Sequence, residues 1–171
     1  MSFAQPNLPV RMGTRPATTA TNPHMQLDQN APYELQDRLR DHALSLPGVT
    51  PGKSQVSVPG TVAFYLNEPT GTPALPAVLG GEWGHIHPHS DGSLHLNVPT
   101  ELAEQVIAAG WAEYHCLVKP GFIPPVVIML YGPRDEEELA VCARVVEEAY
   151  LAAGGNRVDQ TGRPLGLGAS D

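Results

Sequence analysis

Apolar residues recur at intervals of three and four in three segments of this chain, a spacing that places them on one face of a helix. These segments predict helices over residues 33–46, 101–109 and 135–153. Asn30 is positioned to cap the first helix, and Thr100 to begin the second. Asp135, with Glu138 three residues later, forms a capping box at the start of the third.

Shorter apolar and alternating runs predict strands between these helices. They cover residues 55–58, 61–66, 111–117 and 126–131, and a hairpin from about 83 to 98. The run at 126–131 is continuously apolar, as in a central strand buried on both faces. A long Pro- and Gly-rich loop covers residues 67–81. The pattern predicts a single α+β domain, with a mainly antiparallel β-sheet and about three packed helices.

The two ends of the chain differ from this middle part in composition. Residues 1–30 are rich in Pro, Thr, Asn and Gln and have little hydrophobic periodicity, so we expect a flexible leader. Residues 154–171 are Gly-rich, and we expect a flexible tail. The ordered domain is then predicted over residues 31–153, a size that suits one hydrophobic core.

The net charge of −8 narrows the class of partner. Nucleic acids and anionic membranes require a basic surface, so neither is expected as a partner. The start of the chain has no apolar signal-peptide segment, and no apolar run approaches the roughly 20 residues that span a bilayer. We expect a cytoplasmic protein that binds a small molecule. The oligomeric state does not follow from the sequence.

Histidine gathers in the predicted hairpin. Four of the seven histidines lie between residues 85 and 95. Side chains alternate along a strand, so when the apolar residues of the hairpin face the core, its polar and aromatic residues share the opposite face. That face carries Trp83, His85, His87, Ser93, His95 and Asn97. The register requires an odd loop, either residues 90–92 or residues 88–92.

The remaining histidines are assigned by position. His89 falls in the turn of the hairpin, and His24 in the leader. Trp111, Glu113 and His115 alternate onto one face of a later strand. Whether that strand adjoins the hairpin does not follow from the sequence.

Two chemistries suit such a histidine face. In the first, His85, His87, His95 and His115 act as base and acid without a metal. In the second, the same histidines bind a divalent metal (Fe, Mn, Ni or Zn) in a cupin-like site. A purely structural polar face is the simplest alternative. The residues expected to bind substrate are Trp83, Ser93, Asn97, Trp111, Glu113, Tyr131 and Arg134. Arg134 either holds a substrate anion or pairs with the acidic run that follows it.

Three spaced motifs carry a family resemblance. They are HxHxxxDGSLHL from His85, AAGWAEYH ending at His115, and MLYGPRDEEEL from Met129. Together they resemble the luciferase-domain family over residues 55–150. The family takes its name from the luciferase of bioluminescent fungi, an enzyme that oxidises a hydroxypyrone with O2. The resemblance implies a reaction without flavin, nicotinamide or added metal, so no cofactor is favoured.

These observations predict a small enzyme that acts on an enolic or aromatic small molecule by histidine acid/base catalysis, in natural-product biosynthesis. The expected reaction is cofactor-independent oxidation, cyclisation or isomerisation. Two alternatives remain: a metalloenzyme on the same histidines, and a non-catalytic accessory protein that binds a small molecule.

Overall fold

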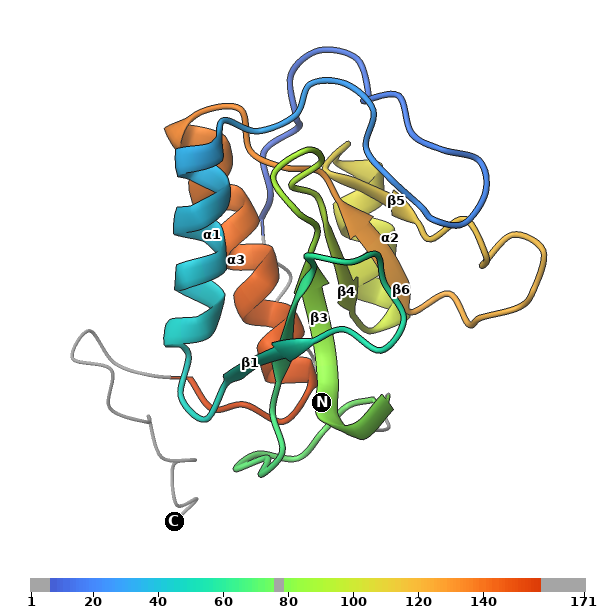
Figure 1. Cartoon of the computed structure of the whole chain (residues 1–171). Helices are drawn as coiled ribbons and strands as arrows, with labels where there is room; N and C mark the ends of the chain where they lie inside the picture. The colour runs from blue at the N-terminus through green and yellow to red at the C-terminus, as the bar shows by residue number, and fades with distance from the viewer. Residues whose placement is uncertain (1–6, 76–78, 158–171) are drawn as a thin grey trace.

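The computed structural model describes residues 7–75 and 79–157. Six antiparallel strands form one sheet in the order β1-β2-β3-β4-β6-β5 (Figure 1). The elements in chain order are α1 (Tyr33–Ser45), β1 (Thr50–Lys53), β2 (Val62–Tyr65), the 3₁₀ turn η1 (Leu79–Gly81), β3 (Glu82–Ile86), β4 (Leu94–Asn97), α2 (Thr100–Ala108), β5 (Ala112–Tyr114), β6 (Val127–Leu130) and α3 (Glu136–Ala152). The predicted α+β fold is confirmed.

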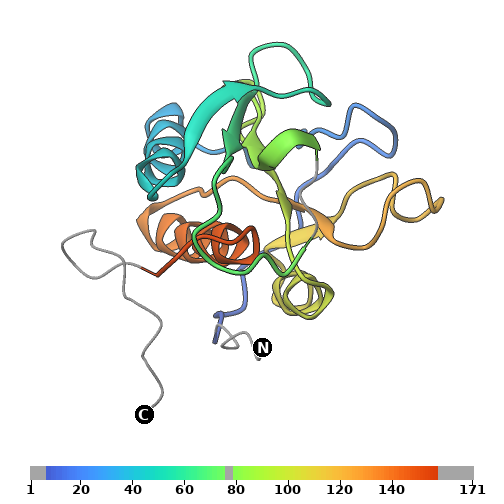
Figure 2. The same cartoon turned by 90° about the horizontal axis from the view of Figure 1, so that it is seen from below.

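The helices gather on one side of the sheet. α1 and α3 lie side by side, and α2 packs beside β5 (Figures 1 and 2). Buried side chains of all three helices and of the strands form one core, which includes Leu39 of α1, Val106 of α2 and Val145 of α3. Among the described residues, no helix is both long enough and apolar enough to cross a membrane.

The predicted caps are partly correct. Asp135 accepts a hydrogen bond from the amide of Glu138 at 2.9 Å, as predicted for the start of α3. Asn30 does not cap α1. Its side-chain amide donates instead to the carbonyls of Gln26 and Asp91, and α1 begins after Pro32 without a side-chain cap.

The first predicted strand is wrong. Residues 50–53 pair with β2, whereas residues 55–58 do not form a strand. The amide of Gln55 donates to Glu82 at 3.4 Å, and that of Val56 to Ser54 at 3.3 Å. Side-chain oxygens thus accept the bonds that a strand partner would otherwise accept.

The hairpin has the register of the longer predicted loop. His85 lies opposite His95 and Ile86 opposite Leu94, and the amide of His87 donates to the carbonyl of Ser93 at 2.9 Å. The loop therefore covers residues 88–92, and the three-residue loop is wrong. The predicted sharing of one face by the hairpin histidines is confirmed.

A β-bulge in β3 changes the face of one predicted site residue. The register between β2 and β3 shifts so that Tyr65 pairs with Glu82 while Phe64 pairs with Gly84. The extra residue, Trp83, points into the core, with its ring 5.3 Å from that of Phe64. The bulge thus moves Glu82 onto the histidine face and removes Trp83 from it.

The predicted leader is ordered over much of its length. Residues 7–30, which we call the N-terminal arm, pass beside β5 (Figure 1). The guanidinium of Arg15 donates to the carbonyls of Ala112 and Ile107 at 2.7 and 2.5 Å. Trp111 donates its indole N–H to the carbonyl of Pro9 at 2.6 Å. Polar contacts hold the arm, which explains why it shows little hydrophobic periodicity.

The predicted leader and tail lie partly outside the residues that the structure describes. Residues 1–6 of the leader and 158–171 of the tail lie outside the described residues. Gly154 packs on the domain, where its carbonyl accepts from the amide of Gly71 at 2.7 Å.

A glycine in the hairpin turn provides a test of this packing. A Cβ added to Gly92 would lie 2.2 Å from Gln36 of α1, whereas one added to Gly121 would meet nothing within 4 Å. Both glycines have positive φ, at 74° and 82°. Gly121→Ala should cost the left-handed strain alone, about 1–2 kcal/mol. Gly92→Ala should cost a further 1–3 kcal/mol, roughly, from overpacking. Urea unfolding of both variants measures the difference, and equal losses would contradict the contact with α1.

Candidate functional site

A cavity of about 580 Å³ lies over the histidine face of the sheet. Its floor carries histidines, and its walls are largely apolar. Val56 and Val58 contribute from the segment after β1, and Leu117 and Ile123 from the segment after β5. Figure 2 shows the N-terminal arm and the segment between β5 and β6 on the side away from α1 and α3. The cavity therefore opens on the face that the helices leave free.

The predicted histidines converge on this floor. The ring of His95 lies 5.1 Å from that of His85 and 4.7 Å from that of His87, between centroids. The ring of His115 lies 4.6 Å from that of His95. Strand β6 separates β5 from β4, so His115 reaches the cluster from just beyond the end of β5. The strand before His115 therefore does not adjoin the hairpin, although His115 itself reaches the hairpin histidines.

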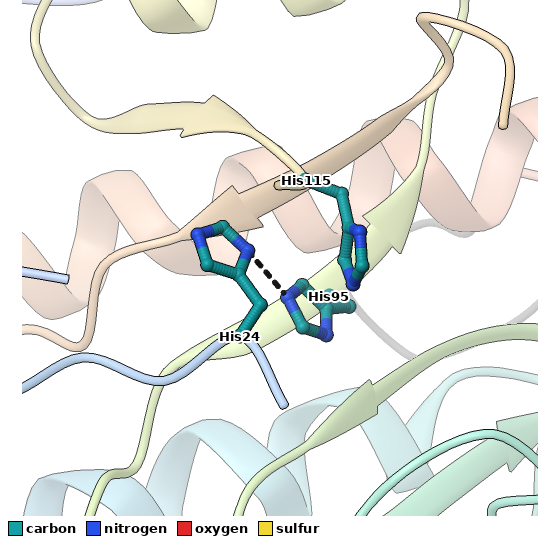
Figure 3. Close-up of side chains that lie close together, drawn as sticks. All are labelled: His24, His95 and His115. Atoms are coloured by element: carbon teal, nitrogen blue, oxygen red, sulfur yellow. Dashed lines mark hydrogen bonds between the residues drawn. The ribbon is translucent and has the colours of Figure 1, made fainter. Parts of the chain in front are cut away.

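A fifth histidine joins the cluster from the N-terminal arm. His24 is 2% exposed, and its Nδ1 lies 3.2 Å from Nε2 of His95. Figure 3 shows the rings of His24, His95 and His115 grouped together, and the centroids of His24 and His115 lie 5.1 Å apart. The interpretation of His24 as a leader residue is therefore wrong. A single histidine within a polar, Pro-containing segment gave no sequence signal for this position.

A continuous chain of hydrogen bonds crosses the floor. Nδ1 of His85 lies 2.9 Å from Glu82, and Nε2 of His85 lies 3.1 Å from Nδ1 of His95. His95 contacts His24, whose Nε2 lies 2.8 Å from Glu113. Each end of this three-imidazole chain is therefore a carboxylate. The hydroxyl of Tyr131 also donates to Glu113, at 2.9 Å.

The carboxylates at the two ends favour their ionised forms. Burial raises the pKa of Glu82, but hydrogen bonds from His85 and Ser54 outweigh it and lower the pKa below its ordinary value. The pKa of Glu113 is lowered in the same way, with bonds from His24 and Thr18 outweighing burial. Two anions thus fix protons on Nδ1 of His85 and Nε2 of His24.

The chain of three imidazoles has one proton fewer than its hydrogen bonds require. Four contacts join the two carboxylates through three imidazoles, and each contact needs one proton. Three neutral imidazoles supply only three. His95 has one proton, so it can donate to His85 or to His24 but not to both. One pair of nitrogen lone pairs therefore faces each other unless a cation lies between them.

Two imidazoles in the chain resist the extra proton. Burial, followed by the neighbouring charges of His85 and His87, lowers the pKa of His95 well below its ordinary value. Burial also lowers the pKa of His85, although its bond to Glu82 opposes this. The chain therefore stays neutral and keeps one pair of facing lone pairs, between which a bound cation would lie.

His87 has its own carboxylate. Its Nδ1 lies 2.6 Å from Asp91 and 3.2 Å from the hydroxyl of Ser93. Asp91 is 1% exposed and also accepts from the amide of Ser93 at 3.0 Å. The aspartate holds the proton on Nδ1 and leaves a lone pair on Nε2 of His87. Asp91 was expected only as a turn residue with either loop length, and its bond to His87 had no signal in the sequence.

His115 has the opposite tautomer. Its Nδ1 accepts a hydrogen bond from the amide of Leu117 at 3.2 Å, so the neutral ring carries its proton on Nε2. Burial, then the charge of His24, lowers the pKa of His115 to about 4. His115 is therefore a neutral donor at neutral pH.

Several predicted substrate contacts lie elsewhere. Arg134 pairs with Glu138 and donates to the carbonyl of Met12 at 2.8 Å, so it binds the acidic run and the arm instead of the cavity. Trp83 and Trp111 are both buried in the core. Of the predicted set, Asn97 lines the cavity.

The other members of that set support the histidines. Ser93 contacts His87, and Glu113 contacts His24. Tyr131 is fully buried behind Glu113; burial, followed by its bond to Glu113, raises the pKa of Tyr131 to about 12 and keeps it a donor.

Part of the chain is similar in sequence to a known protein family. Residues 80–149 match the family model of the luciferase domain. The chain is similar to this family over those residues. Every charged or imidazole member of the site except His24 falls within them, so the arm adds His24 from outside the matched segment.

The chain is also similar to fungal luciferases. It is 31% identical to the luciferase of Neonothopanus nambi over 157 residues, 29% to that of Armillaria mellea over 161 and 28% to that of Armillaria ostoyae over 158. The alignments cover 82–83% of this chain and 59% of each relative, so the chain spans well under two thirds of their length. No solved structure gives a significant match.

The lowered histidine pKa values predict a pH-dependent stability. A histidine whose pKa is lower in the folded than in the unfolded protein binds its proton more weakly when folded. The free energy of unfolding should therefore be highest above pH 6.5 and fall as the pH drops towards 4, the range between the ordinary and folded pKa values of His115. Urea unfolding across this range measures the slope. His115→Gln should lessen it and His89→Gln, at the exposed turn, should not; an unchanged slope in His115→Gln would contradict the burial of this group.

Proposed function

We propose that this chain is an enzyme that binds an enolic or aromatic small molecule in the cavity and promotes loss of its acidic proton at the histidine floor. The observation that carries the proposal is the joining of a largely apolar pocket to imidazoles whose tautomers are fixed by buried carboxylates. Apolar walls suit a planar ring, and fixed imidazoles suit the transfer of a proton to or from its oxygen or carbon.

His87 is the base in this proposal. Asp91 orients the ring and stabilises the imidazolium that forms when Nε2 takes a proton, as the aspartate does in a catalytic triad. His115 has the complementary role, because its Nε2–H is directed by the bond at Nδ1 and is available to donate to an anionic oxygen. His85 and His95 stay neutral in this proposal, because burial lowers the pKa of both rings.

The similarity to luciferases supports oxidation of the resulting anion by O2, and cyclisation or isomerisation would begin from the same anion. The relatives are named luciferases. Because the chain spans 59% of their length, light emission is not part of the proposal. A role in natural-product biosynthesis and a cytoplasmic location remain predictions from the sequence.

Proton exchange tests the proposed deprotonation without requiring the final product. A panel of 4-hydroxy-2-pyrones is incubated with the protein in D2O, and loss of the ring C3 proton is followed by NMR. The protein should accelerate exchange of at least one pyrone, and His87→Asn should slow it by about 10²–10⁴-fold, the usual contribution of a general base. His89→Asn, in the same hairpin but exposed, is the matched control. Exchange that matches buffer, or is unaffected by His87→Asn, would contradict the proposal.

A further inference from the structure

The nitrogen lone pairs that face each other along the His85–His95–His24 chain indicate where a cation would lie. Two groups of three histidines bring one nitrogen each to within 4.8 Å of the others: His85, His87 and His95, and His24, His95 and His115. Both groups contain His95. They differ in whether their nitrogens have lone pairs to offer.

The second group does not offer three lone pairs. Nε2 of His24 donates to Glu113, which leaves on its Nδ1 a lone pair that faces Nε2 of His95 (Figure 3). The free nitrogen of His115 carries a proton, because its other nitrogen accepts from Leu117. A metal at this position would have to displace the bond between His115 and the amide of Leu117.

The first group offers all three. Glu82 holds the proton of His85 on Nδ1 and Asp91 holds that of His87 on Nδ1, so Nε2 of both rings has a lone pair. When His95 donates its proton from Nε2 to His24, its Nδ1 presents the third, 3.1 Å from Nε2 of His85. Nitrogens bound to one metal at about 2.0–2.1 Å in a tetrahedral site lie roughly 3.3 Å apart. This pair already has that spacing.

We propose that this chain binds one divalent transition-metal ion through Nε2 of His85, Nε2 of His87 and Nδ1 of His95. Each ligand has its second nitrogen bonded to a further group, two of them carboxylates, which is the usual arrangement behind metal-bound histidine. Three neutral imidazoles suit Zn²⁺, Fe²⁺, Ni²⁺ or Cu²⁺. All three histidines line the cavity, so a metal bound to them would be open to a ligand there.

The ion would lie between the facing lone pairs of His85 and His95, where the chain lacks a proton. Its chemical role rests on the proposed function: a metal that bound the substrate oxygen would make the substrate proton easier to lose, and that proton would pass to solvent, because Nε2 of His87 would then be a ligand. The site itself rests only on the three nitrogens and their partners.

Zinc titration tests the site independently of catalysis. The full chain is purified without a histidine tag, treated with a chelator and titrated with Zn²⁺ in a calorimeter at pH 7.5. One equivalent should bind. His85→Ala and His87→Ala should each weaken binding at least 100-fold, and Asp91→Asn, which keeps all three ligands, by about 10–100-fold. His89→Ala and His115→Ala should retain the zinc affinity of the unaltered chain.

Two results would overturn the metal site. One is the absence of saturable zinc binding in the unaltered chain; the other is zinc binding that survives His87→Ala but is lost in His115→Ala. Circular dichroism confirms that each variant is folded, and Asp91→Asn keeps the test informative if an alanine variant unfolds. Zinc binding without pyrone exchange would support the metal site and contradict the proposed function. Pyrone exchange by a protein that binds no zinc would support the proposed function and contradict the metal site.

Discussion

Each imidazole on this sheet face needs partners for two nitrogen atoms, and the rest of the site depends on that requirement. An unpaired buried polar group costs about 1–3 kcal/mol, so a cluster of histidines is stable only when other groups complete its bonds. Glu82, Asp91 and Glu113 do so. The same three carboxylates also fix which nitrogen of His85, His87 and His24 carries the proton.

The elements around the site serve those three carboxylates. The bulge in β3 brings Glu82 to the histidine face, and the five-residue hairpin loop places Asp91 under His87. The N-terminal arm supplies His24, the imidazole that joins His95 to Glu113. A small backbone irregularity, a turn and a segment of little regular structure therefore contribute as much to the site as the regular strands.

The sequence predicted those features that follow from periodicity. Alternation placed His85, His87 and His95 on one face, and helical spacing found the three helices, because both patterns are local. It missed Glu82 and misplaced Trp83 because a bulge reverses the alternation without a clear local signal. It missed His24 because the arm is held by polar contacts with distant residues such as Ala112 and Glu113. Arg134 had two alternatives, and only its geometry distinguishes them.

The tautomers of the cavity histidines are the central claim, and ¹⁵N NMR of histidine-labelled protein measures them directly. In chelator-treated protein at neutral pH, the account predicts a proton on Nδ1 of His87 and on Nε2 of His115, assigned by comparison with His87→Gln and His115→Gln. These are the states that Asp91 and the amide of Leu117 impose. A proton on Nε2 of His87, or on Nδ1 of His115, would contradict the account.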